Sequence, residues 1–126
     1  MHQLALGLAV LVALAIIVIG ALYLWRPRAV ARGFGLPLPE DGSNIAWWLR
    51  LKGVRDIVSG LAVLTFMVWG GPRMVGLILL VEALIPVGDM VVILAAKGSA
   101  SSAFGIHGVT ALLMMLTALP LTMGAV

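Results

Sequence analysis

The stretch LKGVRDIVSG, residues 51–60, places Lys52, Arg55 and Asp56 directly before a long apolar run. The rest of the chain makes these charges unusual, because 63% of its 126 residues are hydrophobic and only 10% are charged. An average soluble domain carries about 25% charged residues. In so apolar a chain, a charged side chain must either face water or be held by another polar group.

Three apolar runs are long enough to cross a membrane. Residues 4–25 contain no charge, residues 74–96 contain two carboxylates, and residues 103–126 contain a single histidine. About 20 apolar residues in a helix span the roughly 30 Å of a bilayer's hydrocarbon core. A soluble fold would have to bury nearly all of the chain, so we expect an integral membrane protein.

A fourth apolar run, residues 57–71, is too short to span the membrane alone. Its helix is expected to end at Gly70 and Gly71, before Pro72, because glycine terminates helices and proline suits the start of the next. Counting back about 20 residues from this point places Arg55 and Asp56 within the membrane-embedded helix. The charges of the opening stretch are therefore not loop residues.

The sequence predicts a single domain, residues 1–126, that is an all-α integral membrane protein. Short connections between consecutive helices favour an antiparallel four-transmembrane-helix bundle. The only long connection, residues 26–43, contains prolines and glycines that should break any helix. The expected helices cover about 3–25, 44–70, 73–96 and 102–124.

The basic residues predict the orientation of the bundle. Six of them flank the first or third connection: Arg26, Arg28, Arg32, Arg50, Lys52 and Lys97. Cytoplasmic loops are rich in lysine and arginine, so we expect loops 26–43 and 97–101 in the cytoplasm and both termini outside, in a bacterial inner (plasma) membrane. The sequence pI near 10.2 then reflects attraction to an anionic leaflet, and we expect no nucleic-acid partner.

With this orientation, Arg55, Asp56, Asp89 and His107 come to one depth below the cytoplasmic surface. Ionisable residues in membrane spans cost about 2.5–3.5 kcal/mol at the helix centre and usually face the bundle interior. We therefore predict that the four side chains meet in a polar pocket. We also predict an ion pair of Arg55 with Asp89, or otherwise with Asp56.

Helical spacing adds further polar side chains to this pocket. Lys52, Asp56 and Ser59 share one helix face, and Pro86 should kink its helix beside Glu82. The candidate catalytic residues are Asp56, Asp89 and His107. The candidate ligand-binding residues are Arg55, Lys52, Ser59, Glu82 and Thr110.

Most of these residues also have a purely structural interpretation. An ion pair of Arg55 with Asp89 can simply join two helices, and Lys52 can extend to the lipid headgroups. Glu82 can be neutral and bonded to a backbone group that Pro86 frees, and His107 can be a hydrogen-bonded packing residue. The chain has no cysteine and too few clustered histidines for a metal motif, so neither a metal nor a cofactor is expected.

Three sequence blocks, KGVRDIVSGL (52–61), ALIPVGDMVVIL (83–94) and GIHGVTALLMML (105–116), together carry a family resemblance. With GFGLP (33–37) upstream, they resemble a small four-helix integral membrane family catalogued as domain of unknown function 4267. The resemblance covers about residues 5–124. It implies the fold and the importance of Arg55, Asp56, Asp89 and His107, but no reaction.

Three classes of function remain open from the sequence. The first is a cofactor-free enzyme or a binding protein for a lipophilic small molecule, with two carboxylates driven apart into acid and base roles. The second is a structural or accessory membrane subunit, in which the charges only specify helix pairing. The third is a proton- or cation-coupled transporter acting as a dimer. Membrane lipids, a lipophilic ligand and a second copy of the chain are the expected partners.

Overall fold

The computed structural model describes residues 2–38, 42 and 44–124, and all regular elements among them are helical. Three segments are long and apolar enough to cross a membrane: α1, Gly71–Ala95 and Ala100–Thr122. A further helix, α3, has similar length but carries several charges in its first half. In chain order the elements are α1 (His2–Trp25), α2 (Pro27–Ala31), α3 (Ile45–Trp69), α4 (Gly71–Glu82), α5 (Leu84–Ala95), α6 (Ala100–Ser102), the π-helix η1 (Ala103–Gly108) and α7 (Val109–Thr122).

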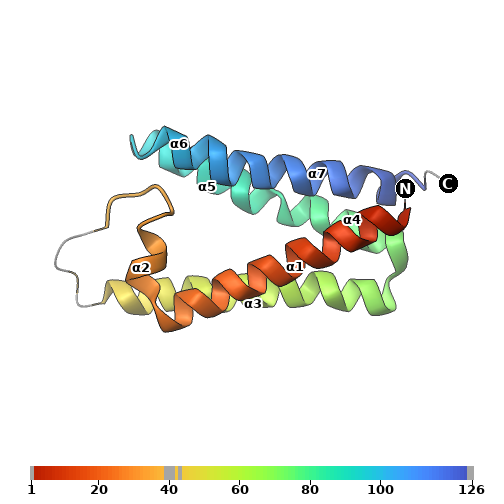
Figure 1. Ribbon diagram of the computed structural model, residues 1–126, viewed down its shortest axis with the longest axis horizontal. Helices are drawn as coiled ribbons and strands as arrows, with labels where there is room; N and C mark the ends of the chain where they lie inside the picture. Colours follow the sequence, from red (N-terminus) through yellow and green to blue (C-terminus); the bar gives the residue numbers. More distant parts are fainter. Residues whose placement is uncertain (1, 39–41, 43, 125–126) are drawn as a thin grey trace.

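The long helices run side by side along the longest axis of the molecule (Figure 1). Both termini and the turn from α3 to α4 lie at one end, here called the terminal end. The connection from α1 to α3 and the turn from α5 to α6 lie at the opposite end, here called the loop end. Helix α1 packs on α3, α4 packs on α7, and α5 packs on η1.

Glycines let α1 and α3 approach closely. A Cβ atom added at Gly20 would lie 2.6 Å from the backbone oxygen of Gly53, and one added at Gly60 would lie 2.6 Å from the backbone oxygen of Ala13. Small residues at such crossings allow the backbones of membrane helices to touch. This close packing determines which α1 side chains can reach the polar residues of α3.

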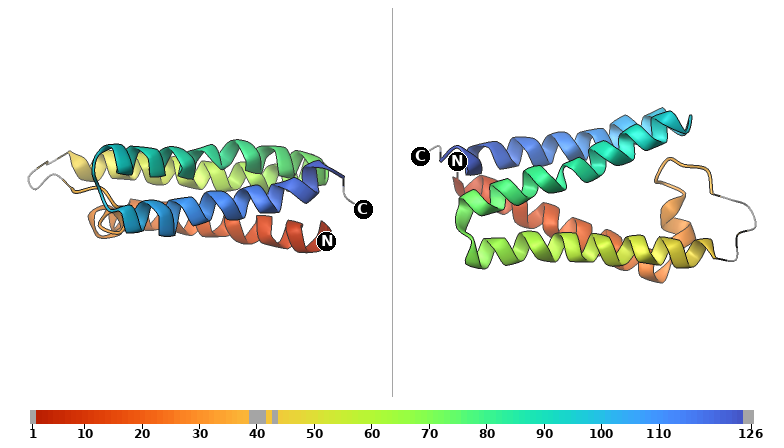
Figure 2. Two further views of the ribbon diagram at one scale, coloured as in Figure 1. Left: turned by 90° about the horizontal axis from the view of Figure 1, so that it is seen from above. Right: turned by 180° about the vertical axis from the view of Figure 1, so that it is seen from behind.

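The apolar core lies toward the terminal end, where all the long helices meet. Its larger members, among them Val63, Val75, Leu79 and Met114, are at most 1% exposed. Toward the loop end the α1–α3 pair diverges from the α5–η1 pair, as Figure 2 shows. No close backbone contact joins α3 to α5 in the described part of the chain. The chain segment that follows α2 crosses between the two pairs at this end.

The helix boundaries differ from the expected ones in two places. A short helix, α2, forms within the connection 26–43, where none was expected; it begins at Pro27, a residue suited to the first turn. The predicted helix 73–96 begins at Gly71 and is interrupted at Ala83, where α4 ends. Pro86 has no N–H to donate to the carbonyl of Glu82, which explains a break close to the predicted kink.

Candidate functional site

A cavity of about 320 Å³ lies between the diverging helix pairs. Its apolar walls include Ile16 and Ile19 of α1, Ile85 of α5 and Ile106 of η1. Seven of the eight residues proposed from the sequence line it: Lys52, Asp56, Ser59, Glu82, Asp89, His107 and Thr110. The structure thus brings these side chains to one place, while their roles as catalytic or ligand-binding groups remain predictions.

Lys52 and Asp56 form an ion pair on the cavity face of α3. The Lys52 Nζ atom donates to Asp56 Oδ2 at 2.8 Å, one helical turn along the same helix. The ammonium also lies 4.9 Å from the ring centroid of Tyr23 and 5.3 Å from that of Phe34. Cations are attracted to aromatic faces at such distances. Lys52 therefore points into the cavity and does not simply extend to the headgroups.

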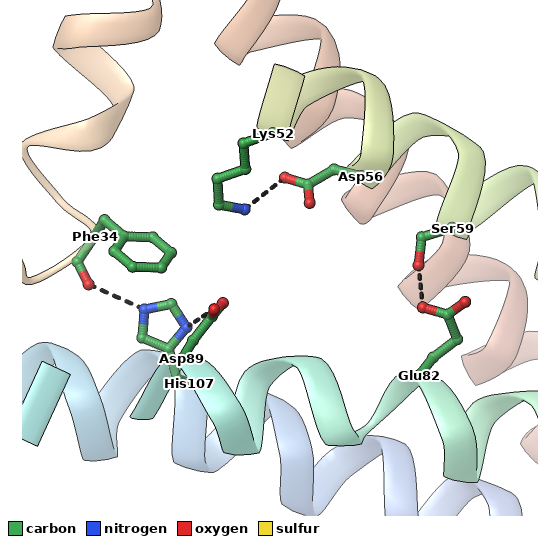
Figure 3. Close-up of polar contacts among 7 residues, drawn as sticks. All are labelled: Phe34, Lys52, Asp56, Ser59, Glu82, Asp89 and His107. Carbon is green, nitrogen blue, oxygen red and sulfur yellow. Dashed lines mark hydrogen bonds and ion pairs between the residues drawn. The ribbon is translucent and has the colours of Figure 1, made fainter. Parts of the chain in front are cut away.

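His107 lies on the π-helix η1 and is 7% exposed. Its Nε2 atom donates to the backbone oxygen of Phe34 at 3.0 Å, since a carbonyl can only accept, and its Nδ1 atom lies 3.5 Å from Asp89 Oδ2. At this distance the ring can pair with the carboxylate when Nδ1 carries a proton. Figure 3 shows the histidine between the carboxylate and the Phe34 carbonyl.

Segments of π-helix are rare and frequently occur at functional sites. Here the π-helix spans the whole turn that presents the histidine to the cavity. Its neighbour Thr110 lines the cavity, but its hydroxyl donates to the backbone oxygen of Ile106 at 2.7 Å. The threonine hydroxyl is thus already occupied within its own helix.

Glu82 lines the part of the cavity that lies away from Phe34 and His107 (Figure 3). Its Oε2 atom accepts a hydrogen bond from the hydroxyl of Ser59 on α3 (Figure 3). The structural alternative considered from the sequence, a bond to a backbone group near Pro86, is therefore not the interaction observed. Because Glu82 ends α4 at the break before α5, its side chain crosses the space between the two helix pairs.

The predicted ion pair of Arg55 with Asp89 or Asp56 is wrong. Asp56 is paired with Lys52, and Asp89 is paired with His107. Arg55 is exposed on α3 and does not line the cavity. On a helical wheel it lies about 60° from Lys52 at 100° per residue, and this offset turns it out of the cavity.

Sequence reasoning missed two aromatic residues of the site, Tyr23 and Phe34. Tyr23 is 3% exposed although it lies near the end of an uncharged run in which no site residue was predicted. Phe34 packs its ring edge-on against His107, with centroids 4.6 Å apart. The signal for Phe34 was its place between two glycines in the GFGLP block, which was used only for the family resemblance.

The segment around Phe34 is anchored to the opposite helix pair. The backbone N–H of Ser99 donates to the Gly35 oxygen at 2.8 Å. Gly35 has φ +112° and packs against Ile93, a conformation and a contact that favour glycine. Phe34 therefore closes the cavity at the loop end.

Metal binding finds no support in the geometry. Among residues 2–38, 42 and 44–124, no group of three or more histidine and carboxylate side chains is placed to hold a metal ion. The polar contacts of the cavity are instead pairwise, as described above.

Comparison with known proteins gives one match. No curated protein and no solved structure matches the chain. A family model described as "Domain of unknown function (DUF4267)" matches residues 13–121, which include every polar residue of the cavity. The three blocks and the upstream GFGLP segment all lie within this match. The chain therefore belongs to the DUF4267 family of domains of unknown function.

Proposed function

We propose that this protein is a four-helix membrane protein whose cavity binds a lipophilic small molecule with a polar head. The polar head lies among the polar side chains of the cavity, and the apolar part lies against the isoleucine walls. The observation that carries the proposal is the cavity of about 320 Å³ with apolar walls and polar side chains from α3, α4, α5, η1 and α7. Ligand sites are typically concave, mostly apolar and fitted with a few converging polar groups.

Helix α3 is the fourth membrane span in this proposal. Trp47 and Trp69 lie near its two ends, are 66% and 81% exposed, and are separated by about 33 Å of helix. Indole side chains gather at the two membrane interfaces, about 30 Å apart. Between them, Val58 and Leu61 are exposed, as expected for a lipid-facing surface. Among the charges of α3, Lys52 and Asp56 neutralise each other, and Arg50 and Arg55 lie in the half of the helix nearest the loop end.

The loop end faces the cytoplasm in this proposal. Arg26, Arg28, Arg32 and Lys97 lie near this end, whereas Arg73 lies near the terminal end. The excess of basic residues follows the positive-inside rule. The cavity then opens in the cytoplasmic half of the bundle, within reach of molecules dissolved in that leaflet.

The two alternative functions receive less support. A purely structural subunit requires paired charges but no cavity, and here paired charges surround one. A transporter requires a polar path beyond Glu82, but beyond it the described core consists of apolar residues such as Val75, Leu79 and Met114. Transport would need a pathway outside this chain's own core.

Catalysis is a second candidate for the same cavity. The Asp89 carboxyl group lies 3.5 Å from the His107 ring and its side chain is 28% exposed, so a bound molecule can reach it. His107 itself has both ring nitrogens occupied, by Asp89 and by the Phe34 carbonyl. Cofactor-free acid–base chemistry would therefore involve Asp89 directly, with His107 as its positioning partner.

Photolabelling tests the binding proposal. A long-chain alcohol carrying a diazirine would be irradiated with the purified full chain in zwitterionic nanodiscs, and labelled peptides would be identified by mass spectrometry. We expect labels on the cavity walls at Ile19, Ile85 and Ile106. Thr110→Phe, which fills the cavity, should abolish these labels, whereas Thr65→Phe on the exposed face of α3 should not.

The result that contradicts the proposal is equally specific. Labels confined to lipid-facing residues such as Val58 and Leu61, or cavity labels that persist in Thr110→Phe, would mean that the probe only dissolves in the bilayer. The paired threonine variants make the comparison sharp, because both introduce the same side chain into a membrane helix.

A further inference from the structure

We propose that the polar head of the cavity's ligand is a protonated amine. This inference rests on the binding function proposed above and specifies its ligand class as lipophilic amines. It derives from the charges and the unused hydrogen-bonding atoms of the cavity, and from the aromatic rings at its loop end.

The charges of the cavity leave one carboxyl group without a cation. In the described part of the chain, all three carboxyl side chains, Asp56, Glu82 and Asp89, line the cavity. Lys52 is paired with the first, and the His107 ring lies 3.5 Å from the third. Glu82 has only the Ser59 hydroxyl as its described partner. A ligand cation would pair with Glu82, whereas a ligand anion would be repelled by the carboxyl groups of the cavity.

The unused hydrogen-bonding atoms of the cavity also favour a ligand that donates hydrogen bonds. Each carboxyl group has one oxygen engaged, and no described buried side-chain oxygen or nitrogen lacks a partner. The second oxygens of Asp56, Glu82 and Asp89 therefore reach the cavity space or its edge. Among the donors, the hydroxyls of Ser59 and Thr110 are engaged, Lys52 Nζ donates to Asp56, and the Tyr23 hydroxyl has no described acceptor. The cavity offers acceptors in excess, so its ligand should donate hydrogen bonds.

The aromatic residues at the loop end already hold an ammonium group. Tyr23 and Phe34 lie 4.9 and 5.3 Å from the Nζ atom of Lys52. Aromatic faces combined with carboxylates are the surroundings that stabilise alkylammonium ions away from water. The isoleucines between this end and Glu82 can accommodate a hydrocarbon chain. An ammonium group at Glu82 therefore matches both the charge and the shape of the cavity.

A lipophilic carboxylate is the principal competing ligand, because Lys52 is a cation within the cavity. Its ammonium, however, is already bound to Asp56 at 2.8 Å. A carboxylate ligand would have to share this ammonium with Asp56, and its negative charge would lie beside the carboxyl groups of the cavity. A neutral alcohol should bind with an affinity between those of the amine and the carboxylate, since it can donate one hydrogen bond but carries no charge.

Competition with the photoprobe tests this order of affinities, in which the amine binds most tightly and the carboxylate least. Dodecylamine, dodecanol and dodecanoate share one chain length and would compete with the labelled alcohol for the cavity in zwitterionic nanodiscs at neutral pH. We expect dodecylamine to compete at a concentration at least tenfold lower than dodecanol, and dodecanoate to compete least. In Glu82→Gln, the concentration at which dodecylamine competes should rise at least tenfold, and that for dodecanol should change less than twofold.

Ser101→Lys is the matched control, because it raises the net charge by one, as Glu82→Gln does, at an exposed site away from the cavity. It should leave the order of the three competitors unchanged. Equal or stronger competition by dodecanol or dodecanoate, or an unchanged dodecylamine result in Glu82→Gln, would overturn the amine assignment. If Thr110→Phe still abolished the cavity labels in that case, the cavity would bind a lipophilic molecule even though the amine assignment is wrong.

Discussion

Replacing Gly53 by alanine should separate α1 from α3. The added Cβ atom would lie 2.6 Å from the backbone oxygen of Gly20 and 2.9 Å from the Cβ atom of Tyr23. A backbone oxygen cannot rotate aside as a flexible side chain can, so the two helices must shift apart. The contact between Tyr23 and Lys52 depends on this packing.

The size of the effect follows from two opposing terms. Overpacking a tight contact costs about 1–3 kcal/mol, whereas replacing glycine by alanine in a helix gains about 0.5–1 kcal/mol. The net loss in the free energy of unfolding should be about 1–2 kcal/mol. Gly7→Ala in α1 and Gly88→Ala in α5 are matched controls, because an added Cβ atom at either position meets no atom within 4 Å.

Unfolding of the purified chain in mixed micelles, titrated with a denaturing detergent and followed by circular dichroism, measures these differences. We expect Gly53→Ala to unfold earlier than the native chain and both controls to unfold at the same point or later. If Gly53→Ala were stabilised as much as Gly7→Ala, the close crossing of α1 and α3 would be wrong. The position of Tyr23 beside the cavity would then lose its basis.

Three further predictions concern the polar site and the orientation. His107→Ala should lower the free energy of unfolding by about 1–3 kcal/mol, because a loop carbonyl loses its only described donor; an unchanged unfolding curve would contradict this contact. Lys52→Met should destabilise the chain more than the double variant Lys52→Met with Asp56→Leu, because the single variant leaves a carboxylate unpaired; equal losses in the same titration would refute the pairing. Single-cysteine variants at Arg28 and Arg73 of this cysteine-free chain should react with an impermeant maleimide from opposite sides of the membrane, and labelling from one side would refute the proposed topology.

Much of the site was predictable from the sequence. The depth of each polar residue follows from helix length, because a membrane helix rises about 1.5 Å per residue and its ends are marked by charges, glycines and prolines. Ionisable residues on three helices were therefore expected at similar depths. Spacing of three, four and seven residues also placed Lys52, Asp56 and Ser59 on one face, and all three line the cavity.

The partners of these residues were not predictable in the same way. Arg55 was expected to bind Asp89, yet Asp89 is paired with His107, and Asp56 is paired with Lys52. Phe34 reaches His107 across 73 positions of the chain. No local pattern specifies such a contact, because it depends on how the segment after α2 crosses between two helix pairs.

The helical character of the chain and its three membrane-length apolar segments follow from the order of the residues, and from the same order the polar residues were expected at similar depths. Which side of α3 faces the cavity, with Lys52 inward and Arg55 outward, follows from how the helices pack. Helical periodicity gives only the angles between side chains. In a soluble protein the apolar face of a helix identifies the core, but a chain with apolar surroundings is apolar both inside and outside. The direction of each helix face is then set by close packing, here at Gly20 and Gly53.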